Sequence, residues 1–530
     1  MEVGTHDQLV LLALLAAVVG LLALAPTLRL PYPILLVLGG LALGFVPGVP
    51  RVRLAPDLVL VGVLPPLLYA AAFFTSLRDL RAKLRPIAQL SIGLVLATVA
   101  GVAAVAHAAV PGLTWGAAFV LGAVVAPTDP IAATAIARRL GAPRRVIALV
   151  EGESLINDAS ALVVYRAAVV AVVSGSFSVW HAGARFVVGA AGGVAIGLAV
   201  GWIVALVRKR INYIPAEIAI SLLTAYLAYL PAAALNVSGV LAAVTTGVYL
   251  GWRSPEVSSP AMRMQGLPVW ETLVFLANSL LFVLVGLELR PILDSLRGQS
   301  MGRLLLDAAT VAGTVVAIRL LWVFPLFYGP RRLWRRLQQG EPLPPWHLPA
   351  LLGWMGMRGA VSLAAALAIP LHTDSGAPFP GRELIVFLAF AVILVTLVFQ
   401  GLTLPPLIRL LGIEDDGREA KEEAKARIKA ADAALARVDE LVDEDWVRED
   451  TAERLRGLYR FRRSRFAARF DGEDDGSIEE RSLNYQRLRR ELLEAERQAV
   501  IALRRAGAIS DDVMHRVERD LDLEDTRLDV

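Results

Sequence analysis

Long stretches of apolar residues, separated by short segments rich in proline or arginine, recur from the start of the chain to about residue 411. Apolar runs of about 18 residues or more are typical of transmembrane helices. The dividing segments predict thirteen spans, at residues 7–25, 31–50, 56–75, 86–110, 114–139, 143–173, 184–207, 214–231, 235–252, 266–289, 302–328, 349–370 and 381–411. The pattern therefore predicts an all-α polytopic membrane protein with about thirteen transmembrane helices.

The first run, at residues 7–25, can also be interpreted as a secretory signal peptide, because Ala23-Leu24-Ala25 resembles a cleavage site. The start of the chain, however, carries Glu2 and Asp7 and no lysine or arginine. Signal peptides normally begin with positive charge. We therefore expect this run to remain as the first span.

The composition changes abruptly after residue 411. Residues 412–530 hold 24 Lys/Arg and 32 Asp/Glu, whereas the preceding part holds 29 and 17. The net charge of +4 is thus an average of two unlike parts and does not indicate nucleic-acid binding. Ala, Glu, Arg and Leu dominate 417–446, 448–470 and 478–507, with a break at 471–476, which predicts a soluble helical tail. Its role is open between a plain helical appendage and a regulatory or dimer-stabilising element.

Basic residues are distributed unevenly between the predicted loops. The odd-numbered loops hold 18 Lys/Arg and the even-numbered loops hold 7. Loops rich in basic residues remain on the cytoplasmic side of a membrane, so the odd loops are predicted to be cytoplasmic. With thirteen spans, the N-terminus then lies outside and residues 412–530 lie in the cytoplasm.

Several ionisable residues fall inside the predicted spans, where each is costly and needs a reason. They are Asp129, Glu153, Asp158, Arg166, Glu271, Glu288, Asp307, Arg319 and Arg358. For Arg166, Glu271, Glu288 and Asp307 we expect a structural or interfacial role, because several of them lie near span ends and can reach water.

The fifth span contains Thr128 and Asp129 between Pro127 and Pro130. Proline lacks an N–H and clashes with the preceding turn, so this segment predicts a broken helix. A break at membrane depth frees carbonyl groups and half-helix ends that can bind an ion. The alternative is a proline kink used only for packing, and an acid at the kink makes that alternative weaker.

The sixth span contains Glu151-Gly152-Glu153-Ser154-Leu155-Ile156-Asn157-Asp158. Ser154 and Asp158 are one helical turn apart on one face, and Glu153 and Asn157 share a neighbouring face. Hydroxyl, carboxylate and carbonyl oxygens suit a small hard cation. A buried carboxylate also binds a proton readily. One group that holds either H+ or a cation, but not both, is the minimum machinery for exchange.

The twelfth span contains Gly353-Trp354-Met355-Gly356-Met357-Arg358-Gly359-Ala360-Val361-Ser362. Small residues around Arg358 predict a second broken helix or a close helix crossing, and the arginine could neutralise half-helix C-terminal ends. The two interrupted spans occupy corresponding places in spans 4–6 and 11–13. Such a pair points to a transporter built from inverted repeats.

Four motifs together resemble the monovalent cation:proton antiporter-1 family, and particularly its bacterial Na+/H+ antiporters. They are Leu64-Pro65-Pro66-Leu67-Leu68, Pro127-Thr128-Asp129-Pro130, Gly152–Asp158 and Gly356–Ser362, in this order. The resemblance implies an antiporter domain over 1–411, a core of helices within about 86–173 and 302–411, and dimerisation helices mostly within 7–75 and 184–289. It also implies a homodimer in a bacterial plasma membrane.

The resemblance also implies a set of site residues. The ion site maps onto Asp158, Ser154, Thr128 and Asp129, with Na+ held by the first three, and the supporting residues are Asn157, Glu153, Arg319 and Arg358, of which Glu153 and Arg319 form an ion pair. One position departs from the pattern. Some relatives place an acid just after the Pro-Pro stretch, where this chain has Tyr69-Ala70-Ala71-Ala72.

The expected activity is exchange of Na+ for H+, with K+ or Li+ as alternative cations and without a cofactor. Electrogenic relatives carry two adjacent acids where this chain has Asn157-Asp158, so one-for-one exchange is predicted. A K+/H+ antiporter is the nearest alternative. An ion channel would need a continuous lining. A membrane-embedded enzyme would need a Ser–His pair or an HExxH metal site, and no HExxH occurs in the sequence.

Overall fold

The computed structural model describes residues 16–23, 25, 27, 30–47, 56–175, 179–211, 213–296, 298–333, 345–415, 417–471 and 477–528. The chain divides into two compact units, Met1–Glu414 and Asp415–Val530. Residues 7–15 of the first predicted span and 472–476 of the predicted tail break lie outside the described residues.

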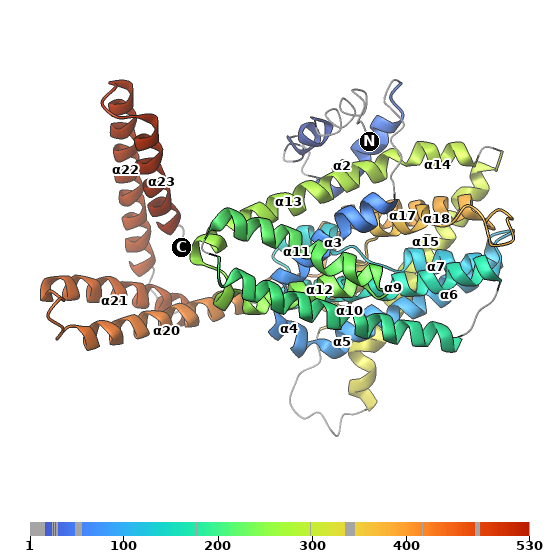
Figure 1. The fold of residues 1–530 in the computed structure, drawn as a ribbon, viewed down its shortest axis with the longest axis horizontal. Coiled ribbons are helices and arrows are strands. Elements are labelled where there is room, and N and C mark those ends of the chain that lie inside the picture. The colour runs from blue at the N-terminus through green and yellow to red at the C-terminus, as the bar shows by residue number, and fades with distance from the viewer. Residues whose placement is uncertain are drawn as a thin grey trace. The chain divides into compact units, whose positions relative to one another are not determined.

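Helices build the first unit, the membrane unit, and run largely side by side (Figure 1). They are α2 (Tyr32–Gly44), η1 (Leu58–Val63), α3 (Leu64–Phe74), α4 (Leu77–Ala82), α5 (Leu84–Ala88), η2 (Gln89–Gly93), α6 (Leu94–Ala109), α7 (Trp115–Val125), α8 (Pro130–Arg139), α9 (Arg144–Ser174), α10 (Val179–Arg208), α11 (Ile214–Ala234), α12 (Gly239–Val257), α13 (Pro260–Leu287), α14 (Leu289–Ser295), α15 (Met301–Leu333), α16 (His347–Trp354), α17 (Ala360–Leu367), α18 (Arg382–Leu394), η3 (Val395–Gln400) and α19 (Gly401–Leu410). The prediction of an all-α protein is confirmed.

Eight helical stretches of the described residues are long and apolar enough to cross a membrane. They are Leu84–Ala109, Trp115–Arg139, Arg144–Ser174, Gly183–Arg208, Ile214–Ala234, Pro260–Ser295, Met301–Tyr328 and Arg382–Leu410. Two shorter apolar helices, Tyr32–Gly44 and Leu58–Phe74, accompany them. The remaining predicted spans correspond to a partly described helix at 16–23, to α12, and to the interrupted pair α16 and α17, so the count of thirteen stays a prediction.

Small residues allow the closest helix crossings of the membrane unit. α2 packs along α13, and a Cβ on Gly40 would collide with the backbone oxygen of Val283. In the same way, a Cβ on Gly286 would collide with the backbone oxygen of Val37. Apolar helices in lipid gain little from the hydrophobic effect between them, so close backbone contact of this kind supplies the packing energy.

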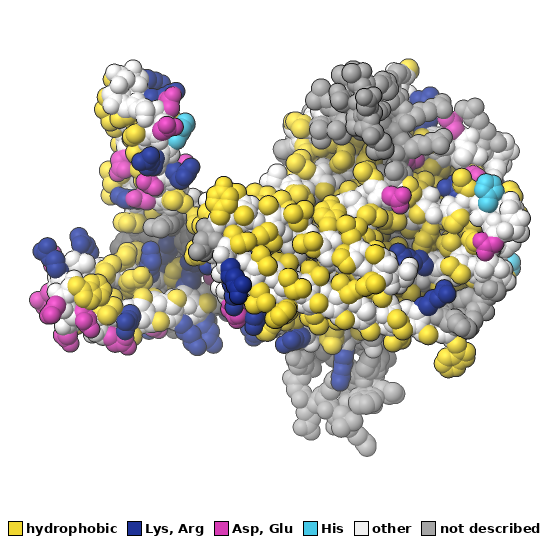
Figure 2. All heavy atoms as spheres, viewed as in Figure 1, with side chains coloured by type: hydrophobic (Ala, Val, Ile, Leu, Met, Phe, Trp, Pro, Cys, Tyr) yellow, Lys and Arg dark blue, Asp and Glu magenta, His cyan; other side chains and the backbone are white. Residues whose placement is uncertain are grey.

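The outer surface of the membrane unit is largely apolar, and Figure 2 shows few charged side chains on the visible face of its helices. Exposed large residues include Trp202, Leu223 and Leu321, each more than half accessible. In a water-soluble protein such a surface would drive aggregation, whereas lipid chains can cover it.

The described residues of the second unit, the tail, form four helices: α20 (Arg418–Leu441), α21 (Glu449–Asp471), α22 (Ser477–Arg505) and α23 (Asp511–Leu528). α20 packs against α21, and α22 packs against α23. The three predicted tail segments coincide with the first three helices, but α23 was not predicted. In this helix the buried residues Met514 and Leu521 lie among seven acidic residues.

Candidate functional site

Both predicted helix interruptions are present, and they meet. α7 ends at Val125 and α8 begins at Pro130, while α16 ends at Trp354 and α17 begins at Ala360. The backbone N–H of Asp129 in the first break donates a hydrogen bond to the carbonyl oxygen of Met357 in the second, at 2.8 Å. The two unwound segments therefore satisfy part of each other's backbone, which is what makes irregular chain tolerable at membrane depth.

The Arg358 side chain binds the carbonyl groups that the breaks leave free. Its Nε donates to the oxygen of Val125, at the C-terminal end of α7, at 3.0 Å. Its Nη1 donates to the oxygen of Gly356, just after α16. The side chain is 1% exposed. A buried cation is thus placed at the negative ends of two half-helices, where their dipoles stabilise it.

Asp129 occupies the opposite kind of helix end. Its Oδ1 accepts a hydrogen bond from the N–H of Ile131 at 2.9 Å and so caps the N-terminus of α8. A Cβ on Gly359 would collide with its Oδ2. Only glycine therefore lets the second break approach this carboxylate, and the N-terminal dipole of α8 favours its negative charge.

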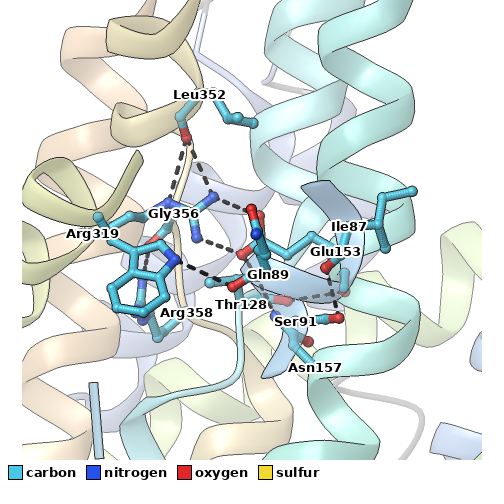
Figure 3. A network of polar contacts seen from close by, with 12 residues as sticks. Ile87, Gln89, Ser91, Thr128, Glu153, Asn157, Arg319, Leu352, Gly356 and Arg358 are labelled. Carbon is cyan, nitrogen blue, oxygen red and sulfur yellow. Dashed lines mark hydrogen bonds and ion pairs between the residues drawn. The ribbon is translucent and has the colours of Figure 1, made fainter. Parts of the chain in front are cut away.

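A buried polar network joins the first break to α9 and α15 (Figure 3). The Thr128 hydroxyl donates to Glu153 Oε1 at 3.1 Å and accepts from Asn157 Nδ2 at 2.6 Å. The Ser154 hydroxyl donates to the Thr128 carbonyl oxygen at 3.0 Å. Three side chains of α9 thereby hold the unwound residue Thr128 in one position.

Glu153 also forms a bidentate ion pair with Arg319, with N–O distances of 2.5 and 2.8 Å. The guanidinium donates in addition to the carbonyl oxygen of Leu352 in α16, from Nε at 3.4 Å and from Nη2 at 3.3 Å. Each side chain of the pair is 1% exposed. Arg319 therefore links α15 to the sixth predicted span and to the second interrupted helix at once.

A cavity of about 310 Å³ lies beside this network. Its polar lining includes Thr128, Asp129, Ser154, Asp158 and Ser362. Asp158 is 5% exposed, and its carboxyl group has no hydrogen-bond partner among the residues that the structure describes. A carboxylate in that position is costly when charged and unpaired, so it favours binding of a cation or a proton.

Apolar residues of α3 and α13 form much of the remaining cavity wall, including Leu68 and Phe282. Within the stretch Tyr69–Ala72, Ala71 lines the cavity, whereas Tyr69 packs against Trp270 with ring centroids 5.3 Å apart. Arg138 and Glu151 also line the cavity, and their ion pair of 2.6 Å is partly exposed to solvent. They mark the side on which the cavity approaches the surface.

The predicted site residues thus fall into two groups. Thr128, Asp129, Ser154 and Asp158 line the cavity, and the four predicted supporting residues lie behind it as hydrogen-bonding and charged partners. Sequence reasoning did not single out Ser362 as a site residue. Its hydroxyl is buried in the cavity wall and has no partner within the described residues. Its place at the end of the second interruption, four residues after Arg358, was the available signal.

Sequence reasoning also missed a buried ion pair outside the cavity. Arg208 at the end of α10 and Glu217 at the start of α11 are both 2% exposed, and Nη2 lies 3.9 Å from Oε2. Arg208 also donates to Ser258 Oγ at 2.9 Å. Glu217 falls inside the predicted span 214–231, which was the signal that it needed a partner.

The other four interior charges singled out in the sequence lie outside the cavity lining. Asp307 pairs with Arg303 one turn earlier, at 3.1 Å, and Glu288 is buried beside the start of α14. Arg166 and Glu271 are exposed on α9 and α13. None of the four lines the cavity.

The family pattern described as sodium/hydrogen exchanger, transmembrane, matches residues 12–410. The chain belongs to the sodium/hydrogen exchanger family. This membership makes it a cation/proton antiporter, a multi-pass membrane transporter and not an enzyme, and it confirms the resemblance that the four motifs indicated.

Relatives of this exchanger match it over most of its length. An uncharacterised Na+/H+ exchanger of Mycobacterium tuberculosis is 39% identical over 525 residues, which cover 98% of this chain and 96% of the relative. The sodium, potassium, lithium and rubidium/H+ antiporter of Bacillus pumilus is 34% identical over 75% of this chain and 60% of the relative. The structure of the sodium proton antiporter MjNhaP1 from Methanocaldococcus jannaschii matches with a TM-score of 0.61 at 21% identity, over 76% of this chain and 99% of that one. The exchanger therefore has that antiporter fold.

Proposed function

We propose that this exchanger moves Na+ in one direction and H+ in the other, one for one, and that the two ions compete for Asp158. The observation that carries the proposal is the cavity, which is lined by the buried Asp158 carboxylate, without a partner among the described residues, and by Thr128 and Ser362 from the two broken helices. Such a carboxylate is neutralised equally well by a bound proton or by a monovalent cation.

The ligands for Na+ in this proposal are Asp158, Ser154 and Thr128, all of which provide oxygen atoms. Hard oxygen ligands suit Na+, and they also accept K+ or Li+. The name of the Bacillus relative includes several monovalent cations, which supports the transport of a broad range of monovalent cations by this exchanger. K+/H+ exchange is the alternative within the same mechanism, because oxygen chemistry alone does not distinguish the two ions.

The supporting residues hold the ligands in place. Asn157 and Glu153 hydrogen-bond to the Thr128 hydroxyl, and Arg319 neutralises Glu153. Arg358 neutralises the free carbonyl ends at the two breaks. In this view none of these four binds the transported ion, and each fixes the geometry of the site.

The one-for-one stoichiometry rests on the neutrality of Asn157. Only Asp158 then titrates at this position, and the charge of the site is the same whether Na+ or H+ is bound. Asp129 stays charged throughout the cycle because the N–H of Ile131 and the N-terminal end of α8 stabilise its carboxylate.

The remaining proposals concern placement in the membrane. The excess of basic residues in the odd-numbered loops places the N-terminus outside and residues 412–530 in the cytoplasm of a bacterial cell. Helices within 86–173 and 302–411 move as the core against dimerisation helices within 7–75 and 184–289, which gives alternating access. A homodimer is the proposed assembly.

The test is ion exchange in proteoliposomes that contain the purified exchanger and a pH-sensitive dye. Titration with Na+, K+ and Li+ gives the cation preference. An imposed membrane potential, set with valinomycin and K+ gradients, gives the stoichiometry when Na+ drives exchange. A rate and end-point that ignore the potential support one-for-one exchange. An end-point that shifts with the potential shows net charge movement and overturns the role given to Asn157.

A further inference from the structure

One face of α21 combines arginines with exposed apolar side chains. Residues 454–470 contain seven arginines and no aspartate or glutamate. Within this stretch, positions spaced i, i+4 and i+7 or i+8 lie on a single side of a helix. The arginine–leucine face, as we call it, consists of Arg454, Leu455, Leu458, Phe461 and Arg462. All five are exposed, and the three large apolar side chains are 38–42% accessible.

The opposite side of α21 is already occupied by α20. Arg456 pairs with Asp439 at 2.8 Å, and Arg463 pairs with Asp432 at 2.6 Å. These arginines lie on the side of the helix turned away from Arg454 and Leu458. The hairpin of α20 and α21 therefore uses part of the positive charge of α21 internally and leaves the arginine–leucine face without a packing partner in that hairpin.

Acidic residues elsewhere in the tail are also in use. Arg497 of α22 pairs with Asp522 and Asp525 of α23, and Arg504 pairs with Asp511. Among the described residues, no acid forms an ion pair with Arg454 or Arg462, and the Arg462 guanidinium lies 5.6 Å from the ring centroid of Tyr459. The tail as a whole is acidic, so this face is a local concentration of positive charge on a negative unit.

We propose that the arginine–leucine face binds the anionic surface of the lipid bilayer. Leucine and phenylalanine side chains can enter the boundary between headgroups and acyl chains while the arginines contact lipid phosphates. α20 begins at Arg418, only eight residues after α19 ends at Leu410, and this short connection keeps the tail at high local concentration near the membrane. The net negative charge of the rest of the tail opposes the contact, so binding depends on lipid charge and on ionic strength. The proposal rests on the cytoplasmic placement of the tail and not on the ion site.

The absence of cysteine from the chain provides a clean reporter for the test. The full-length variant Leu458→Cys, labelled with an environment-sensitive fluorophore, is reconstituted in phosphatidylcholine alone or mixed with phosphatidylglycerol. We expect a blue-shifted emission only with phosphatidylglycerol, and its reversal by salt. In that background, Arg454→Gln with Arg462→Gln should weaken the apparent association about 25-fold, since each arginine near an anionic surface contributes about fivefold.

Two controls separate lipid binding from other causes. A label at Leu523→Cys reports on a leucine of similar exposure, 39% against 42% for Leu458, that lies among acids of α23. Arg516→Gln with Arg519→Gln removes the same charge from α23. The label at Leu523→Cys should not respond to lipid charge. The double arginine substitution in α23 should leave the lipid response of the Leu458→Cys label unchanged. An equal response at Leu523, no response at Leu458, or a response that follows protein density rather than lipid charge would each overturn the proposal. Na+/H+ exchange measured in the same samples tests the proposed transport separately.

Discussion

Glu153 and Arg319 in the membrane unit form an ion pair of 2.5 Å, and Arg437 and Glu440 in the tail form one of 2.6 Å. The lengths are nearly equal, but the surroundings are not. Each side chain of the first pair is 1% exposed, whereas those of the second are 66% and 62% exposed. Water screens the tail pair and can replace either partner, while nothing can replace a partner in the membrane unit.

The comparison extends to the number of charges in each unit. The tail contains many acids and arginines in exposed pairs, such as Arg448 with Asp450 and Arg504 with Asp511. In the interior of the membrane unit several charged groups have defined partners: Arg358 binds freed carbonyls, Asp129 caps a helix, and Glu153 pairs with Arg319. Asp158 differs from both groups, because it is buried without a protein partner among the described residues. This difference indicates that the burial of a charged group, rather than the number of ion pairs in its unit, shows whether the group serves structure or transport.

The largest effect is expected for Asp158→Asn. This variant should fold and insert but lose Na+/H+ exchange, because its amide can neither release a proton nor provide a negative charge to Na+. The measurement is dye-monitored exchange in proteoliposomes. Asp307→Asn is the matched control, since Asp307 is equally buried but pairs with Arg303 outside the cavity. Normal Na+-driven proton movement in Asp158→Asn would refute the assignment.

The next effect concerns the buried pair. Glu153→Ala leaves Arg319 as an unpaired charge in the bilayer interior, which should cost about 3–5 kcal/mol of stability. Thermal unfolding in detergent measures it, and the apparent cation affinity should change less than the stability. Removal of both charges, in Glu153→Gln with Arg319→Met, should recover part of the loss. A stable Glu153→Ala exchanger with altered cation selectivity would show instead that Glu153 takes part in ion binding.

A smaller effect is expected for Ser362→Ala. If the Ser362 hydroxyl supplies an additional oxygen to the bound cation, its loss should lower the apparent Na+ affinity about fivefold, which corresponds to about 1 kcal/mol. Ser279→Ala removes an equally buried hydroxyl that has no partner among the described residues and does not line the cavity, and it should leave the affinity unchanged. Equal affinities for Ser362→Ala and the parent protein would exclude Ser362 from the site.

The smallest effect belongs to the exposed pair. Arg437→Ala should change the stability of the tail by at most about 0.5 kcal/mol, as is usual for exposed pairs at this helical spacing. Chemical unfolding of the tail within the full chain, followed by a fluorophore attached to Trp446→Cys as the single cysteine, measures the change. A loss of stability comparable to that of Glu153→Ala would contradict the view that burial decides how much each ion pair contributes to stability.

Local chemistry explains why much of the site was predictable from the sequence. The break at Thr128-Asp129 follows from two prolines, and the shared face of Ser154 and Asp158 follows from their spacing on one helix. Both depend on neighbours in the chain. The apolar runs and the change of composition after residue 411 similarly determined the helical class and the separation of the tail.

Tertiary structure alone decided the features that join distant segments. The bond from Asp129 to Met357, the position of Ser362 in the cavity wall, and the bond from Arg208 to Ser258 each unite elements far apart in sequence. No local pattern specifies which side of a short helix such as α17 faces a cavity, because apolar residues occupy most of the positions in the helix itself. The sequence by itself determined which residues could bind an ion, and the packing of the two broken helices decided which of them face the same space.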